Sequence, residues 1–213
     1  MTEYLSEMNR LRLRWHGSWA EVGLPHPPAA GFEGLVARYR EPHRAYHTLK
    51  HLEECFALLD ELRPLAKAPA VIELALWYHD AVYWPRRSDN EEASAELARR
   101  DLEVARAVSP LIEAVTAMIL ATTHQALPPA GDTEILIDID LGILGAEPSR
   151  FAEYERQIRK EYSWVPEFLF RPKRAEVLDR FLARPQIYRT SPLHARLEAR
   201  ARHNLAAATR RTS

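Results

Sequence analysis

The sequence of 213 residues has only one cysteine, Cys55, and no long apolar run. A single cysteine cannot form an internal disulfide, which excludes the disulfide-stapled scaffolds of small secreted proteins. No apolar stretch approaches the roughly 20 residues of a membrane-spanning helix. The first residues, Met1 to Glu7, also lack the basic start and apolar run of a signal peptide. These absences predict a cytoplasmic protein with no membrane segment.

The chain also lacks an excess of charge of either sign. It has 29 basic and 30 acidic residues, for a formal net charge of −1. Binding to a nucleic-acid polymer requires a strong positive field, so we expect small molecules as ligands instead. The hydrophobic content of 46% is enough to bury a substantial core. We therefore predict one domain over 1–213, with a core of about 35–208 and an N-terminal helix of about 3–21 packed on it.

No convincing run of two-residue alternation is present, whereas apolar residues recur at spacings of three and four. This pattern predicts an all-α fold of about eight to ten helices. The run Ile135 to Leu144 is ambiguous because its β-branched residues also suit a strand. We predict a helix there, since a lone strand would have no sheet to join. The predicted helices cover about 3–21, 31–40, 47–62, 71–78, 90–107, 109–123, 135–144, 148–163, 166–183 and 193–208.

Residues of metal-ligating types occur at three places in this pattern. His47 and His51 are four residues apart, which predicts one helical face for both side chains. The doublet His79-Asp80 ends a helix that is apolar nearly all round. A charged aspartate there needs a partner to offset its desolvation, and a metal ion supplies one. Capping of a neighbouring helix by Asp80 is the structural alternative.

Asp138 and Asp140 stand in an otherwise apolar run, where carboxylates are rarely buried without a reason. On a helix, residues two apart point about 200° away from each other. Only one of the two is therefore expected to face a site, while the other caps a helix, forms an ion pair or reaches solvent.

These residues resemble the signature of the HD superfamily of metal-dependent phosphohydrolases, which is a His, a His-Asp doublet and a later Asp on separate helices of an all-α core. The segments that carry the resemblance are His51-Leu52-Glu53-Glu54-Cys55, His79-Asp80 and Asp140-Leu141-Gly142. Tyr46-His47 with His51 is also similar to the Tyr-His-Asn-x-x-His segment of cyclic-nucleotide phosphodiesterases, with Thr48 in place of the Asn. Further segments, among them Arg44–His47, His79–Tyr83, Asp89–Ala95, Ile137–Gly145, Ile158–Tyr162 and Ala201–Leu205, are similar to a bacterial branch of predicted HD phosphohydrolases.

The resemblance implies one or two divalent ions bound by His51, His79, Asp80 and Asp140. Asp80 is the natural bridge, and hence a catalytic residue, if two ions bind. Asp138 is an alternative for the last ligand, and His124 is a possible additional one. This donor set suits Mn²⁺, Mg²⁺, Fe²⁺, Co²⁺ or Zn²⁺ without selecting among them. His47 is then the residue expected to protonate the leaving oxygen or to hold a phosphate oxygen.

The resemblance implies hydrolysis of a small phosphate ester, such as a nucleotide or a related phosphomonoester or diester, by metal-activated water. Arg44, Lys50, Tyr83 and Asn90 are the candidate substrate-binding residues, although Arg44 and Lys50 are equally explained as surface charges. A non-catalytic module that binds metal and nucleotide stays open, as does a hydratase, lyase or di-iron oxygenase on the same fold. A homo-oligomer is also compatible with the sequence.

Overall fold

The computed structural model describes residues 2–126 and 128–212, so that Met1, Leu127 and Ser213 lie outside the described residues. Over these two ranges every regular element is helical and no strand occurs, which confirms the predicted all-α class. The ten α-helices are α1 (Thr2–Glu21), α2 (Gly31–Arg38), α3 (Leu49–Leu62), α4 (Pro69–Tyr78), α5 (Asn90–Val104), α6 (Ser109–Ala121), α7 (Asp132–Asp140), α8 (Pro148–Glu161), α9 (Glu167–Leu182) and α10 (Ser191–Thr212). Two short 3₁₀ helices, η1 (Arg63–Leu65) and η2 (Leu141–Gly145), follow α3 and α7.

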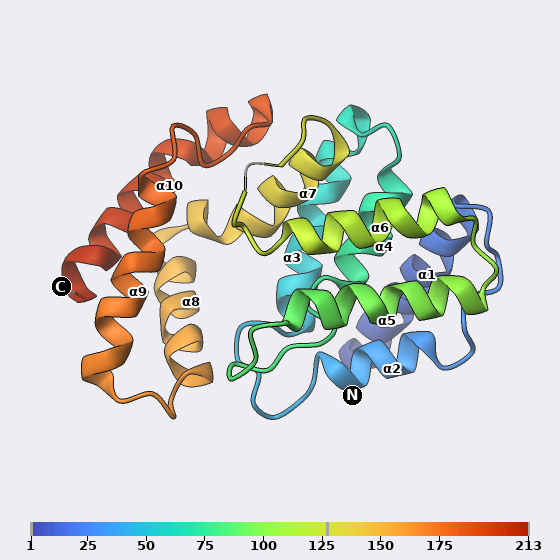
Figure 1. Ribbon diagram of the computed structural model, residues 1–213, viewed down its shortest axis with the longest axis horizontal. Helices are drawn as coiled ribbons and strands as arrows, with labels where there is room; N and C mark the ends of the chain where they lie inside the picture. Colours follow the sequence, from blue (N-terminus) through green and yellow to red (C-terminus); the bar gives the residue numbers. More distant parts are fainter. Residues whose placement is uncertain (1, 127, 213) are drawn as a thin grey trace.

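Helix α4 forms the centre of the larger group of helices. Eight of its residues, Ala70 and all those from Ile72 to Tyr78, are buried. Helices α1, α3, α5, α6 and α7 pack against it (Figure 1). A helix that is apolar on all sides is stable only when neighbours cover each side, and this arrangement supplies them. The C-terminal end of α4 is thereby held in the interior of the protein.

The ambiguous run Ile135 to Leu144 is helical, as predicted. It divides between the end of α7 and η2, and the change from α to 3₁₀ geometry falls at Asp140. Ile135, Leu136, Ile137 and Ile139 are buried in the common core. Asp140 therefore lies at a break between two helical segments, where a side chain is less enclosed by its own helix.

Helices α8, α9 and α10 form a second group beside the first (Figure 1). Helix α10 packs along α9 and against η2, and η2 also contacts α8. The segment that contains Asp140 is thus the connection between the two groups. Among the described residues, no helix has both the length and the apolar character needed to cross a membrane.

Candidate metal centre

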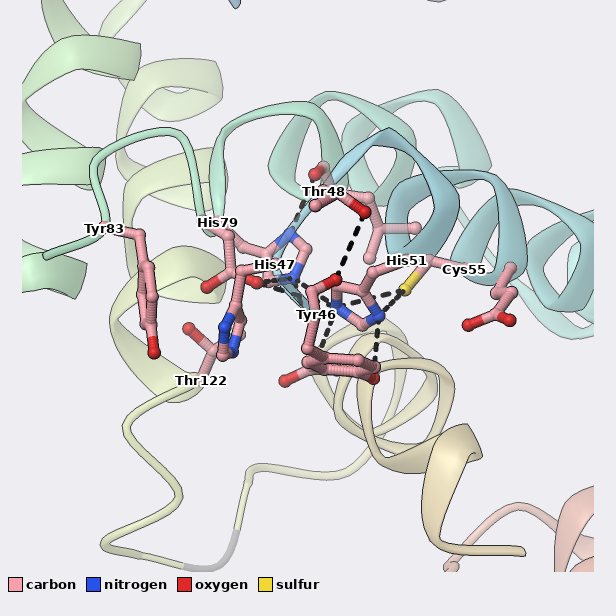
Figure 2. Close-up of polar contacts among 12 residues, drawn as sticks. Tyr46, His47, Thr48, His51, Cys55, His79, Tyr83 and Thr122 are labelled. Carbon is pink, nitrogen blue, oxygen red and sulfur yellow. Dashed lines mark hydrogen bonds and ion pairs between the residues drawn. The ribbon is translucent and has the colours of Figure 1, made fainter. Parts of the chain in front are cut away.

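Three separate elements bring four of the predicted ligands together. His51 lies in the first turn of α3, His79 and Asp80 follow the last residue of α4, and Asp140 ends α7. The packing of α3 and α7 against α4 makes these helix ends meet. Figure 2 shows the rings of His51 and His79 close together, with Tyr46 and Cys55 on either side of His51.

The distances among the four side chains fit the coordination of one ion. His51 Nε2 lies 3.2 Å from His79 Nε2, 3.6 Å from Asp80 Oδ2 and 3.3 Å from Asp140 Oδ1. His79 Nε2 lies 3.0 Å from Asp80 Oδ2 and 3.5 Å from Asp140 Oδ1. Ligand atoms that are each about 2.0 to 2.2 Å from one ion lie about 2.8 to 3.6 Å from one another in octahedral or tetrahedral geometry. All five distances fall in that range.

The hydrogen bonds of the two imidazoles leave both Nε2 atoms directed at the same point. His79 Nδ1 lies 2.8 Å from the carbonyl oxygen of Leu76, which can only accept, so Nδ1 carries the proton. His51 Nδ1 lies 2.9 Å from the hydroxyl of Tyr46 and can donate to it in the same way. Two Nε2 lone pairs at 3.2 Å would repel each other unless a cation or a proton lies between them. Metal-ligating histidines commonly show this arrangement, in which the ring nitrogen that does not bind the ion donates to an oxygen atom of the protein.

The electrostatics keep both carboxylates ionised. Burial raises the pKa of Asp80, but the nearby His79 and His47 outweigh burial and hold the pKa below its usual value. Burial also raises the pKa of Asp140, and hydrogen bonds from His124, His51 and His79 outweigh it and hold the pKa well below the usual value. Conversely, the carboxylates outweigh the effect of burial on His79 and raise its pKa well above the usual value. The centre is thus a partly buried pair of anions that needs positive charge.

Asp138 does not belong to this cluster. Its carboxylate accepts hydrogen bonds from the backbone N–H groups of Arg189 and Thr190 and from the Thr190 hydroxyl, at 2.6 to 3.0 Å. It therefore ties α7 to the segment that leads into α10. The alternative assignment of Asp138 as a metal ligand is corrected: the two aspartates diverge, and Asp140 is the one that reaches the histidines.

His47 is near the cluster, but the prediction that it shares a helical face with His51 is wrong. Helix α3 begins only at Leu49, and His47 lies in the turn before it. Its ring stacks on Tyr83 with centroids 4.0 Å apart (Figure 2). The turn is held by Glu161 of α8, whose Oε1 accepts from the backbone N–H groups of Ala45, Tyr46 and His47 at 2.7, 2.7 and 3.1 Å.

Glu161 also fixes the orientation of the His47 ring. Its Oε2 accepts from His47 Nδ1 at 2.8 Å and from the Tyr83 hydroxyl at 2.9 Å. Burial lowers the pKa of His47, but the charges of Asp80 and Glu161 outweigh it and raise the pKa above its usual value. For Glu161 itself burial is outweighed by His47 and the backbone amides, which lower the pKa to about 2. His47 therefore carries a proton more readily than an isolated histidine.

His124 lies beside Asp140, in the segment between α6 and α7. Its Nε2 is 3.0 Å from Asp140 Oδ2, while its Nδ1 is buried without a hydrogen-bond partner in the described structure. Its backbone has φ of 54°, a left-handed conformation that is uncommon outside glycine. His124 thus contacts Oδ2 of the predicted ligand Asp140, whereas the rings of His51 and His79 lie near Oδ1 of the same carboxylate.

A cavity of about 720 Å³ opens onto this centre. It is lined by His47, Asp80, His124 and Asp140 on one side and by residues of α8 and α9 on the other. Tyr83 and Asn90, two of the predicted substrate-binding residues, also line it. Tyr83 is engaged by Glu161, and Asn90 exchanges two hydrogen bonds with the backbone of Trp84, at 3.0 and 3.1 Å. Their described contacts therefore position the walls of the cavity.

Arg44 and Lys50 are not in this lining, so the prediction that they hold the substrate is corrected. The Arg44 side chain is fully buried and donates to the carbonyl oxygens of His47, Asp80 and Ala81. It fixes the backbone around the His-Asp doublet. Lys50 forms a surface ion pair with Glu153 at 2.9 Å.

Some residues of the site were not assigned from the sequence. Cys55 follows His51 by one helical turn, and its Sγ lies 3.7 Å from His51 Nε2. The ligand-type atoms of His51, Cys55, His79 and Asp140 all lie within 4.8 Å of one another. Burial and the nearby Asp140 raise the pKa of the Cys55 thiol well above its usual value, so it stays protonated and is a poorer ligand than Asp80.

The second unassigned group consists of cations on α9 and just beyond it, which line the cavity: Lys173, Arg174, Arg180 and Arg184. A signal for three of them was present, because Lys173, Arg180 and Arg184 are spaced by seven and four residues, the spacing of one helical face.

No protein family model, curated protein or solved structure matches this chain. The class of the protein therefore rests on its own fold and site.

Proposed function

We propose that the protein is a metal-dependent phosphohydrolase of the HD superfamily that hydrolyses a small phosphate ester, such as a nucleotide. The observation that carries the proposal is the convergence of two imidazole nitrogens and two ionised carboxylates, and both carboxylates line a cavity that lysine and arginine also line. His51, His79, Asp80 and Asp140 would hold the ion. When bound there, a divalent cation supplies polarisation of a phosphoryl oxygen and activation of water.

Other residues of the chain would position the proton donor and enclose the substrate. Glu161 holds the His47 ring through Nδ1, so that Nε2 is the ring nitrogen left to face a ligand. His47 lines the cavity, and the charges of Asp80 and Glu161 raise its pKa, which suits donation of a proton to the oxygen of the leaving group. Tyr83 stacks on the ring and restricts its rotation. Apolar residues of the cavity such as Leu169 and Phe170 cover the body of the ester.

The test is hydrolysis of phosphomonoesters and phosphodiesters by protein reconstituted separately with Mn²⁺, Mg²⁺, Fe²⁺, Co²⁺ and Zn²⁺. We expect metal-dependent release of phosphate or of the free alcohol. Asp80→Ala should lower kcat at least about a hundredfold, because it removes a ligand and leaves the other buried charges unbalanced. The matched control is Glu113→Ala, which removes an exposed carboxylate on α6 and should leave kcat unchanged.

Activity that persists in Asp80→Ala would refute the proposal. Tight binding of metal and nucleotide without any product would instead identify a non-catalytic binding module.

A further inference from the structure

The cavity wall formed by α9 has more positive charge than its neighbours neutralise. Five cations line the cavity, and three of them have acidic partners: Arg87 pairs with Asp89, Lys173 with Glu176, and Arg174 with Glu155. Within the part of the chain that the structure describes, Arg180 and Arg184 have no carboxylate within ion-pair distance. Neither arginine is therefore neutralised by a direct ion pair, although Lys173 and, to a smaller extent, the charge of Arg180 lower the pKa of Glu176, and both arginines line the cavity.

These two arginines are one helical turn apart, so their like charges lie close together. Such a pair is destabilising by itself at a spacing of four residues. Burial lowers the pKa of Arg184, and the positive charge of Arg180 lowers it further, as repulsion between the two guanidinium groups requires. An anion between the two guanidinium groups would remove it, because arginine presents several N–H donors in a planar fork that matches phosphate oxygens.

Arg184 is also connected to the metal centre through one residue. Its Nη2 donates to the backbone carbonyl of His124 at 2.9 Å, and His124 Nε2 lies 3.0 Å from Asp140 Oδ2. Arg184, His124 and Asp140 also line the same cavity, so that a ligand in the cavity has both places in its walls. Phe181, whose ring lies under the Arg184 guanidinium at 4.7 Å, limits the directions that this arginine can take.

We propose that Arg180 and Arg184 form an anion subsite, and that the substrate is a phosphate ester with a second phosphoryl group, which this subsite binds while the first lies at the metal centre. The inference rests on the proposed function for the role of the first phosphate. The subsite itself depends only on the cations of the α9 wall. Bisphosphorylated compounds are thus the substrate class that this cavity selects over monophosphates.

The experiment compares adenosine 3′,5′-bisphosphate with adenosine 5′-monophosphate by calorimetric titration of the Mn²⁺-loaded protein. We expect the bisphosphate to bind at least about tenfold more tightly, since charge-assisted hydrogen bonds to arginine contribute on that scale. Arg180→Ala should bring the ratio of the two dissociation constants close to one, and Arg180→Lys should restore part of it. The matched control is Arg171→Ala, an exposed arginine of α9 that pairs with Glu167 outside the cavity and should leave the ratio unchanged.

A ratio near one in the unmodified protein, no measurable binding of the bisphosphate, or a ratio that survives Arg180→Ala would each overturn the subsite. Turnover is measured separately on the same samples. An Arg180-dependent preference, in a protein that hydrolyses neither compound nor any of the phosphomonoesters and phosphodiesters tested above, would support the subsite and refute the phosphohydrolase. Asp80-dependent hydrolysis of the monophosphate, together with a ratio of dissociation constants near one, would support the phosphohydrolase and refute the subsite.

Discussion

Glu161 fixes the position of His47, the proposed proton donor, relative to the helices. One carboxylate accepts three backbone N–H groups, the His47 ring and the Tyr83 hydroxyl, and it does so from a helix that is 78 to 116 positions away from these groups in the sequence. A buried carboxylate is costly unless its lone pairs are satisfied, and here they are. The position of His47 therefore depends on a residue outside the metal-ligating set.

We expect Glu161→Gln to lower the pKa of His47 by about one unit, because the substitution removes an opposite charge within hydrogen-bond distance and keeps an oxygen for the backbone amides. The pKa is measured by NMR titration of the imidazole resonances, with the exposed His203 as an internal reference. A proton donor must be protonated, so activity falls as pH rises through the pKa of His47. The alkaline limb of the pH–rate profile should therefore move to lower pH in Glu161→Gln. An unshifted His47 resonance would show that Glu161 does not control this ring.

The residues of the centre could be recognised from the sequence for a physical reason. Charged residues in apolar helices are improbable without a partner, so Asp80 and Asp140 were visible as exceptions to an otherwise regular pattern. Arg44 was not predictable in the same way. A buried arginine that binds backbone carbonyls and an arginine that binds phosphate look alike in sequence, and only the packing separates them.

The 3₁₀ helix η2 packs closely against α10, which leaves little room for a side chain at one of its glycines. A Cβ at Gly145 would lie 2.6 Å from Leu197 Cβ and 3.1 Å from the Leu197 carbonyl oxygen. At Gly142 a Cβ would meet only the end of the flexible Leu58 side chain. Close packing at Gly145 and hydrogen bonds from Arg200 and Asn204 of α10 to the carbonyl oxygens of Leu144, Gly145 and Ala146 hold α10 against η2 at this point.

Gly145→Ala should lower the free energy of unfolding by about 1 to 3 kcal/mol, because helix backbone cannot move as a side chain can. Gly142→Ala should cost less than about 1 kcal/mol, since Leu58 can change rotamer. Gly17→Ala, in the open middle of α1, should stabilise the protein by about 0.5 to 1 kcal/mol through helix propensity. Urea denaturation of the three variants checks the order. Equal losses for Gly145→Ala and Gly142→Ala would mean that η2 and α10 separate easily.

The extent of the elements was largely predictable, and the exceptions have tertiary causes. Helical periodicity predicted every α-helix, including the ambiguous run before η2. The start of α3 was predicted at about 47, two residues too early: residues 45–47 form a turn whose backbone N–H groups donate to Glu161. No local pattern reveals a partner contributed by α8.

At the level of the whole molecule, the centre joins α3, α4 and α7, and its cavity lies against the second group of helices. The carboxylates of Asp80 and Asp140 are ionised and lie together in a partly buried site, which opposes folding unless positive charge is present. Without an ion, protonated histidine supplies that charge, as the raised pKa of His79 indicates. A metal ion bound by the proposed ligands would therefore compete with protons for the same nitrogen atoms.

This competition predicts how metal stabilises the protein. Addition of Mn²⁺ to chelator-treated protein, at about a hundredfold above its dissociation constant, should raise the free energy of unfolding by about 2.7 kcal/mol. The gain should be larger at about pH 8 than at about pH 6, because a raised pKa means that His79 must lose a proton before it can bind metal, and that loss becomes harder as pH falls. Thermal or urea unfolding with and without Mn²⁺ measures the difference.

Asp140→Asn should lose most of the gain at both pH values. Asp138→Asn weakens the attachment of α10, and it should lower the stability of the protein with and without metal by the same amount. If the two variants respond to Mn²⁺ alike, the ion binds somewhere other than the junction of α3, α4 and α7.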